Sequence, residues 1–510
     1  MANSKTNGFT RRCQGFLGSR KCFLAILALF GVQAAWIALS GRYPMAFDEN
    51  FHLGLIRLYA DHPSPFWGAQ PAGADIFGAV VRDPSYLYHW LMSFPYRLIA
   101  AFTADQSTQV LWLRFLNIGL FAAALPLYRR LLLKTGASRA IVHGCLAVFV
   151  LIPIVPLLAA QLNYDNLLLP LTALVLLLTV KFSEDLGRGR LNVTAALQLT
   201  IIALLACLVK YAFLPIALVA AAYLLIRLWQ AYHGRGTFRT NLVAGWRSLN
   251  GVSRTLLLTG LLVSLGLFAQ RYAVNLAQYH KPVADCAQVL SAERCRAYSP
   301  WVRDQDLEDH KPSGASRSPL AFTGDWFYGM WLRSFFAVDG PATDFQTRGP
   351  LVLPGIGAVV FGAIAAVAPV ITWPKLTRRY NRRVIWLFVA VTAGYAAVLW
   401  LDGYQSFLQT GQAVAINGRY LLPVMPLLLI LLALGVNTLL GRRQTAKLAF
   451  GGAALLCLIW GGGALTYILR SNTDWYRPNS PLTGANQTIQ RNVGPLVPGY
   501  NTPTQFMGRN

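Results

Sequence analysis

The sequence predicts an all-α polytopic membrane protein from its composition, the length of its apolar runs and the distribution of its charges. Of the 510 residues, 55% are hydrophobic and only 13% are charged, whereas soluble domains carry roughly 25% charged residues. A helix that crosses a bilayer needs about 20 consecutive, mostly apolar residues. Runs of this length recur along the chain and are continuously apolar, which is typical of helices and not of the alternating strands of a membrane barrel.

We expect about eleven transmembrane helices. The first run follows a cluster of basic residues and could belong to a cleaved signal peptide, but its apolar part is longer than the 7–15 residues typical of such peptides. We therefore favour an uncleaved first helix. The expected spans lie near residues 22–40, 109–128, 140–159, 167–182, 191–209, 211–229, 255–273, 351–373, 384–401, 419–440 and 447–469.

The formal charge of +25 is explained by membrane orientation. If the N-terminus is cytoplasmic, the inner loops, counted with Arg227 at a helix end, hold 25 of the 45 lysines and arginines and only two acids, Glu184 and Asp185. Basic residues concentrated on one side are what the positive-inside rule requires. No basic run is interleaved with aromatic residues in the manner of a nucleic-acid site, so we expect no nucleic-acid partner.

In this topology a long outer loop, residues 274–350, carries Cys286 and Cys295. An oxidising exterior would allow these two residues to form a disulfide. Two free thiols are the alternative, and a zinc site is less favoured because no other Cys or His is suitably spaced. The topology divides the chain into five parts: a cytoplasmic tail 1–21, a transmembrane module 22–273 with a first outer loop 41–108, an outer loop 274–350, C-terminal transmembrane helices 351–469 and an outer tail 470–510.

The first outer loop contains two unusual stretches. "FDENFHLG", residues 47–54, places Asp48, Glu49 and His52 directly after the first span. "RDPSYLYHWLMSFPYRLI", residues 82–99, is apolar and aromatic but interrupted by prolines. As a transmembrane helix it would invert the basic loop that follows, so we expect an interfacial helix on the outer leaflet, where Tyr and Trp are favoured.

Charged residues from distant parts of the chain are predicted to share this outer face. Singly, each has a simple structural explanation: loop acids can be solvated, Asp165 can cap a helix, and Lys or Arg at helix ends can snorkel to the interface. Their convergence on one face instead favours a functional site. The candidates are Asp48, Glu49, His52, His89, Arg114, Tyr164, Asp165, Lys210, Tyr211, Arg419 and Tyr420.

These motifs resemble those of known membrane enzymes. "FDENFHLG" resembles the aspartate-glutamate motif in the first outer loop of protein O-mannosyltransferases. The following "DPSYLYHW", with Arg114 and then Asp165 beyond it, is similar to the layout of aminoarabinose transferases that act on lipid A; both groups are GT-C glycosyltransferases. "INGRYLLPVMP" at 416–426 and "LVKYAFLP" at 208–215 are similar to an uncharacterised polytopic bacterial family with a glycine-arginine-tyrosine-x-x-proline signature.

The resemblance implies a GT-C-like fold and glycosyl transfer, and the chemistry agrees. Sugar nucleotides are made in the cytosol, so a donor that reaches an outer site is expected to be a polyprenyl-phosphate-linked sugar. We expect Lys210, Arg419 with Tyr420, and Arg114 to bind its phosphate, because fixed cations stabilise a leaving group's developing charge. The acceptor is a lipid, a glycan or a protein. The outer loop 274–350 is too short for the sugar-binding insert of the mannosyltransferases, and the tail after residue 469 is too short for the globular outer domain of many GT-C enzymes.

Asp48 is the expected general base, which would take the acceptor's proton during inversion at the anomeric carbon. We expect Glu49 and Asp165 to assist catalysis, and the histidines and tyrosines of the candidate set to contact substrate. Glu49 and His52 are three residues apart and can meet on one helical turn. They are therefore candidate ligands for a divalent cation (Mg, Mn or Ca), which GT-C enzymes often need.

Two other function classes stay open. A transporter or flippase of lipid-linked glycans would be expected to carry ionisable residues at mid-membrane and matched broken helices in two halves, and we find neither pattern in the sequence. A glycan polymerase or ligase of another fold would carry its catalytic residues in later loops. We therefore expect an integral inner or plasma membrane glycosyltransferase with its active site on the outer face.

Overall fold

The structure is a computed structural model, which describes residues 8, 12–233, 236–312, 318–335, 337–339, 346–348, 350–414, 416–471, 473–478 and 480–500. Most of the predicted cytoplasmic tail before residue 12, parts of the outer loop 274–350 and the last ten residues of the outer tail lie outside them. The described chain is helical apart from one antiparallel pair of short strands, β1 (Ala337–Asp339) and β2 (Gln346–Arg348).

Eight described helical segments are long and apolar enough to cross a membrane. They are α2 (Arg20–Ser40), α5 (Gln106–Leu133), α8 (Asp165–Gly187), η2 with α10 (Tyr211–Phe213, Leu214–Tyr232), α12 with η3 and α13 (Gly251–Phe268, Ala269–Ala273, Val274–Tyr279), α18 (Val352–Arg379), α19 (Arg382–Thr410) and α21 with α22 (Gln444–Ile459, Ala464–Arg470). The protein is therefore a polytopic α-helical membrane protein, as the composition predicted.

Three shorter apolar helices lie at the remaining predicted runs: α6 (Arg139–Leu151), α9 (Val193–Val209) and α20 (Met425–Leu439). Helix α6 ends before Ile152, whose backbone is extended, because the ring of Pro153 disfavours the helical conformation of the residue before it. The short helix α7 (Ile154–Ala159) follows. The total of eleven spans stays a prediction, since these three fall below the length of the other eight.

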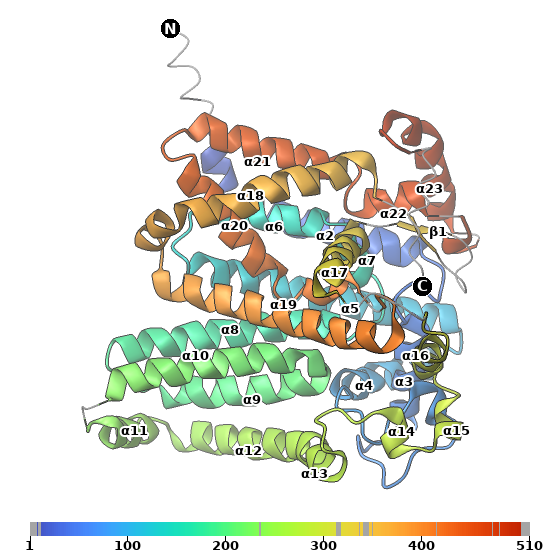
Figure 1. Ribbon diagram of the computed structural model, residues 1–510, viewed down its shortest axis with the longest axis horizontal. Helices are drawn as coiled ribbons and strands as arrows, with labels where there is room; N and C mark the ends of the chain where they lie inside the picture. Colours follow the sequence, from blue (N-terminus) through green and yellow to red (C-terminus); the bar gives the residue numbers. More distant parts are fainter. Residues whose placement is uncertain are drawn as a thin grey trace.

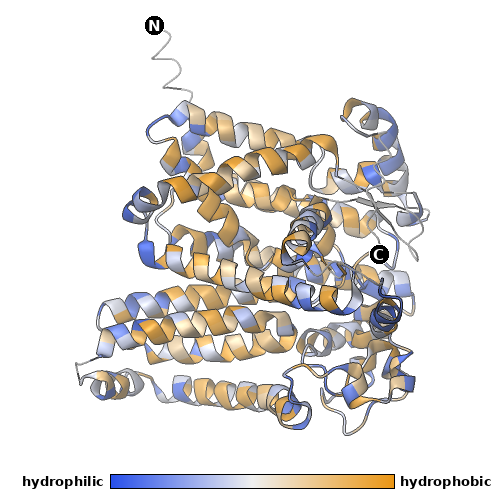
Figure 2. Ribbon diagram, viewed as in Figure 1, coloured by the Kyte–Doolittle hydropathy of each residue, from blue (hydrophilic) through white to orange (hydrophobic). Residues whose placement is uncertain are grey.

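The long helices lie roughly parallel to one another (Figure 1). Helices α8, α9, α10 and α12 form one group, α18, α20, α21 and α6 form another, and α5 and α19 lie between the groups. Hydrophobic residues cover the length of these helices, and hydrophilic residues gather toward their ends (Figure 2). This distribution is the one expected of helices whose middle sections face lipid or each other.

The first outer loop folds into two helices that pack on each other, α3 (Glu49–Ala60) and α4 (Leu87–Phe102), with a short turn η1 (Ala74–Phe77) between them. Helix α4 covers most of the predicted interfacial segment and continues through Pro95. Its exposed apolar residues recur every three or four positions, on one face of the helix. Such a face is typical of a helix that lies along a membrane surface. The exposed residues are Leu91, Phe94, Leu98 and Phe102.

Short helices complete the predicted outer side. Cys286 and Cys295 form a disulfide that joins α14 (Cys286–Val289) to α15 (Ala292–Cys295). The other elements are α11 (Phe238–Arg247), α16 (Ser299–Asp309), α17 (Pro319–Phe335), η4 (Gly418–Leu421), η5 (Thr473–Trp475), α23 (Pro481–Asn492) and η6 (Gly494–Leu496). Of these, only α11 belongs to the side that we predicted to be cytoplasmic.

Candidate functional site

The site begins at an unusual turn between α2 and α3. Phe47 and Asp48 both adopt left-handed backbone conformations, with φ of 68° and 69°. Non-glycine residues in this region cost on the order of 1–3 kcal/mol each and persist only where their surroundings hold them. The turn directs Asp48 outward: its side chain is 59% exposed, whereas Phe47 and Glu49 on either side are buried.

Arg419 of η4 holds this turn from the other end of the chain. Its Nη2 atom donates to Oδ2 of Asp48 at 2.9 Å, and Nη1 donates to the carbonyl of Phe47 at 3.3 Å. The guanidinium also lies 5.1 Å from the centre of the Phe47 ring. Its Nε atom is buried and has no hydrogen-bond partner within the described residues.

A second, deeper ion pair joins the starts of two neighbouring elements. Nζ of Lys210, which follows α9, donates to Oδ1 of Asp165, the first residue of α8, at 2.7 Å. Both side chains are almost completely buried. The ammonium lies 4.5 Å from the centre of the Tyr164 ring and 5.0 Å from that of Tyr420. Aromatic faces attract cations, so the two rings help to hold a charged lysine at this depth.

Tyr420 connects the two ion pairs. Both cations lie near its ring, with the Arg419 guanidinium 5.3 Å from the ring centre and the Lys210 ammonium 5.0 Å from it. The structure therefore brings the predicted residues Asp48, Asp165, Lys210, Arg419 and Tyr420 into one cluster. Because these residues are predicted to lie on the outer face, we call it the outer-face cluster. Tyr211, directly after Lys210, has 48% of its surface exposed.

His52 and His89 form a buried pair beside this cluster. Nδ1 of His52 and Nε2 of His89 are 2.9 Å apart and the two rings are stacked. Burial lowers the pKa of His89 to about 3 and also lowers the pKa of His52. Both rings are therefore neutral near pH 7. The His52 ring meets the Tyr164 ring edge to face at 4.8 Å between centres, which links the pair to Lys210.

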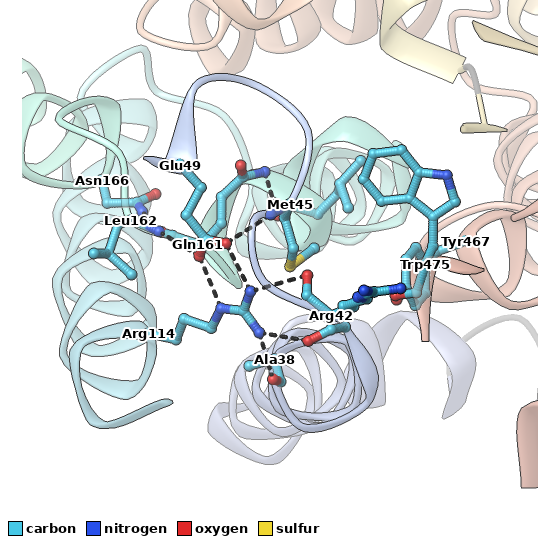
Figure 3. A network of polar contacts seen from close by, with 12 residues as sticks. Ala38, Arg42, Met45, Glu49, Arg114, Gln161, Leu162, Asn166, Tyr467 and Trp475 are labelled. Carbon is cyan, nitrogen blue, oxygen red and sulfur yellow. Dashed lines mark hydrogen bonds and ion pairs between the residues drawn. The ribbon is translucent and has the colours of Figure 1, made fainter. Parts of the chain in front are cut away.

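Glu49 and Arg114 have a different surrounding, shown in Figure 3. Oε1 of Glu49 accepts from Nε of Arg114 at 2.8 Å and Oε2 accepts from Nη2 at 2.7 Å. The backbone N–H groups of Met45 and Leu162 also donate to this carboxylate. Both side chains are buried, with 0% of Glu49 and 3% of Arg114 exposed.

The remaining donors of Arg114 are also used within the protein. They bind the carbonyl oxygens of Ala38, Gly41 and Arg42, where α2 ends. A guanidinium has five N–H groups and a carboxylate about four acceptor positions, so this buried pair is saturated. The predicted phosphate contact of Arg114 and the predicted catalytic role of Glu49 therefore do not fit the structure. The pair instead fixes the first loop against α2 and α5.

The predicted cation pair does not fit either. The Glu49 carboxylate accepts hydrogen bonds from these four donors, so it has no free acceptor position for a cation shared with His52. The part of the chain that the structure describes contains no group of three or more His, Cys, Asp or Glu residues that could hold a metal ion. A divalent cation stays an expectation taken from the resemblance.

Two charged residues belong to the neighbourhood of the site without having been predicted. Arg333 of α17 interacts electrostatically with Tyr420 and Arg419; burial lowers the pKa of its guanidinium, Tyr420 opposes that shift and Arg419 adds to it. Asp83 precedes α4 and accepts the Ser85 N–H at 2.9 Å, and burial raises its pKa. Burial raises the pKa of Tyr298 to about 12, and the carboxylates of Asp83 and Asp48 add to this shift, so Asp83 belongs to the wider surroundings of the site.

The fold and the cluster define a polytopic membrane protein in which paired carboxylates and cations from distant segments meet at the ends of its apolar helices. Comparison with models of known protein families, with curated proteins and with solved structures found no match.

Proposed function

We propose that this protein is a membrane glycosyltransferase with a GT-C-like fold, which transfers a sugar from a polyprenyl-phosphate donor to an acceptor hydroxyl on the outer side of the membrane. The observation that carries this proposal is the turn at Asp48. An exposed carboxylate held 2.9 Å from a buried guanidinium, in a backbone conformation that costs free energy, is the arrangement expected of a functional group and not of a solvated loop acid.

The cations of the outer-face cluster suit a donor phosphate. Arg419 places its guanidinium beside the exposed Asp48 carboxylate, and Lys210 is paired with Asp165 and lies against two aromatic rings. Arg333 adds a third positive charge beside Arg419. Fixed cations in a partly dry site stabilise the negative charge that develops on a leaving phosphate, and they do so without reorganising during the reaction.

In the proposed reaction the acceptor oxygen attacks the anomeric carbon of the sugar. The bond from that carbon to the phosphate oxygen breaks, and the electron pair leaves with the polyprenyl phosphate, toward Arg419 and Lys210. Asp48 takes the proton of the acceptor hydroxyl as general base. One displacement of this kind inverts the anomeric configuration.

The other site residues act by position. Asp165 holds Lys210, the Glu49–Arg114 pair fixes the turn, and the neutral His52–His89 pair with Tyr164 and Tyr211 offers hydrogen bonds and ring surfaces to a sugar.

We also propose that the N-terminus is cytoplasmic and that the site faces the periplasm or the exterior, in an inner or plasma membrane. The 25 cations of the predicted inner loops support this orientation. The lipid part of the donor would lie among the transmembrane helices, so membrane lipid is a further contact. The acceptor belongs to the lipids, glycans or proteins of the cell surface, and nucleic acid is not expected to bind.

A transfer assay tests the function. Protein in liposomes would receive a radiolabelled polyprenyl-phosphate hexose and total surface glycolipids from the source cells as acceptors. The proposal expects label in the acceptor fraction together with an equal amount of released polyprenyl phosphate. Movement of the labelled lipid between leaflets without any release would contradict it and favour a flippase. Label that accumulates as longer lipid-linked chains would favour a polymerase.

A further inference from the structure

A second polar cluster lies at the other end of α8 from Asp165, where α8 and α10 meet the start of α19 (Figure 1). A cavity of about 80 Å³ opens there. Its polar lining consists of Ser183, Glu184, Tyr223, Asn381 and Arg383. This volume is several times what one water molecule needs, so the cavity can hold a larger polar group.

Two guanidiniums lie close together at this cavity: Arg383 belongs to its lining, and Arg227 contacts Ser183 of the lining. Nε of Arg227 donates to Oγ of Ser183 at 3.2 Å. A Cβ atom placed on Gly187 would lie 2.6 Å from Nη1 of Arg383 and 3.9 Å from Nη2 of Arg227, so both nitrogens lie within 4 Å of one point. The two guanidiniums carry the same charge and therefore repel each other.

No carboxylate compensates the two guanidiniums within the described residues. Glu184 is the one acid in the cavity lining, and its carboxylate accepts from Lys134 at 2.9 Å. The cluster around the cavity therefore keeps a surplus of positive charge. An anion between Arg227 and Arg383 would replace their repulsion by two charge-assisted contacts, which are the stronger kind of hydrogen bond.

Two hydroxyl groups line the same cavity. The Ser183 and Tyr223 hydroxyls are 3.1 Å apart, and both belong to the cavity lining. Helix α19 begins at the cavity, and its N-cap residue Asn381 makes no capping hydrogen bond with its side chain. The first N–H groups of a helix carry a partial positive charge, so this helix start adds to the charge of the guanidiniums.

We propose that this cluster is a binding site for a phosphate-bearing anion, with Arg227 and Arg383 as the charged contacts and Ser183 and Tyr223 as hydroxyl contacts. The phosphodiester of an anionic phospholipid and free inorganic phosphate share this chemistry. The lipid has ready access, because the cavity lies between three apolar helices at the ends that carry the basic loops, where anionic headgroups gather. The site is separate from the outer-face cluster and does not depend on the glycosyltransferase proposal.

The test is native mass spectrometry of the purified protein titrated with phosphatidylglycerol, with phosphatidylcholine as the neutral comparison. The variant Arg227→Gln/Arg383→Gln loses both charge-assisted contacts and should need at least about tenfold more phosphatidylglycerol for equal occupancy. Arg442→Gln/Arg443→Gln removes the same charge from exposed arginines of another basic loop and should bind as the wild type does. Arg383→Gln alone, a change at an exposed residue, keeps the test possible if the double variant does not fold.

A separate arm distinguishes the two sources of the anion. Inorganic phosphate at 10 mM, added without lipid, should raise the melting temperature of the wild type and not of the variant if free phosphate is bound. Retention of phosphatidylglycerol without any phosphate effect would assign the site to the lipid headgroup. Equal phosphatidylglycerol binding by the wild type and the Arg227/Arg383 variant, or an equal loss in the Arg442/Arg443 control, would overturn the proposal.

Discussion

Two carboxylates that are adjacent in the sequence have opposite surroundings. The Asp48 side chain is 59% exposed and meets one guanidinium, whereas Glu49 is buried and accepts hydrogen bonds from Arg114 and two backbone N–H groups. A sequence pattern treats them as one acidic motif. The two residues differ in role because the left-handed turn at Phe47 and Asp48 directs the Asp48 side chain outward and the Glu49 side chain inward. No residue in the local sequence predicts that turn.

Arg419→Lys should impair sugar transfer although the charge is kept. Arg419 binds the Asp48 carboxylate and the Phe47 carbonyl at once, and an ammonium cannot reproduce that fork. We expect kcat/KM for the donor to fall by about tenfold to a hundredfold, in line with the loss of one or two charge-assisted hydrogen bonds. Arg303→Lys on α16, an exposed residue, is the control. Full activity of Arg419→Lys would contradict the proposed role and would leave Arg419 as an interfacial anchor only.

Asp165→Ala should destabilise the protein by about 3–5 kcal/mol, because it leaves the buried Lys210 ammonium without its partner. The double variant Asp165→Leu/Lys210→Met removes both charges and should recover much of this loss, yet it should transfer no sugar. Unfolding in detergent, followed by tryptophan fluorescence, measures the first effect, and the transfer assay measures the second. A double variant that is stable and active would remove Lys210 from the site.

At the level of elements, the positions of the apolar helices can be predicted from the sequence, and some of the points where they are interrupted can be predicted as well. Hydropathy located the helices because a spanning segment must satisfy its backbone internally, and Pro153 explains the division between α6 and α7. The meeting of α17 with η4 could not be predicted. It brings Arg333 beside Arg419 through packing between segments 86 residues apart, and nothing in the composition of α17 marks that arginine.

Gly418→Ala should separate these two elements. A Cβ atom at Gly418 would lie 2.1 Å from Oγ of Ser334 and 2.5 Å from the carbonyl oxygen of Met330, both on α17. Because a backbone atom blocks the methyl group, η4 must shift and Arg419 moves with it. We expect a lower melting temperature and a loss of transfer, measured side by side with Gly452→Ala, where a Cβ would meet nothing within 4 Å. Equal behaviour of the two variants would refute this account of the motif glycine.

For the whole molecule, charge and hydropathy predict a polytopic membrane protein, and the structure agrees. The candidate site was predictable as a set of residues on one face, since membrane topology alone sorts loops into two groups. Which of them pair was not predictable: Arg114 and Glu49 formed a saturated internal pair, while Asp83 joined the neighbourhood. Ion pairing depends on distances of a few ångströms, which a topological argument does not contain.

The predicted topology can be measured by cysteine labelling in a background without the five free cysteines. Exposed positions on each side serve as probes. We expect a membrane-impermeant maleimide to label Asn50→Cys and Gln305→Cys in intact cells, and to label Arg188→Cys and Arg442→Cys only after permeabilisation. Labelling of Asn50→Cys and Arg188→Cys under the same condition would contradict the orientation on which the outer site depends.

The central claim is that Asp48 is the general base of a glycosyl transfer, and the most direct test is the single-turnover rate of Asp48→Asn. The asparagine keeps the size of the side chain and can still accept the Arg419 hydrogen bond, but it cannot take the acceptor's proton. Loss of a general base typically costs about 10²- to 10⁴-fold in rate, and we expect a loss of this size with donor affinity nearly unchanged. A rate equal to that of the wild type would contradict the catalytic role of Asp48.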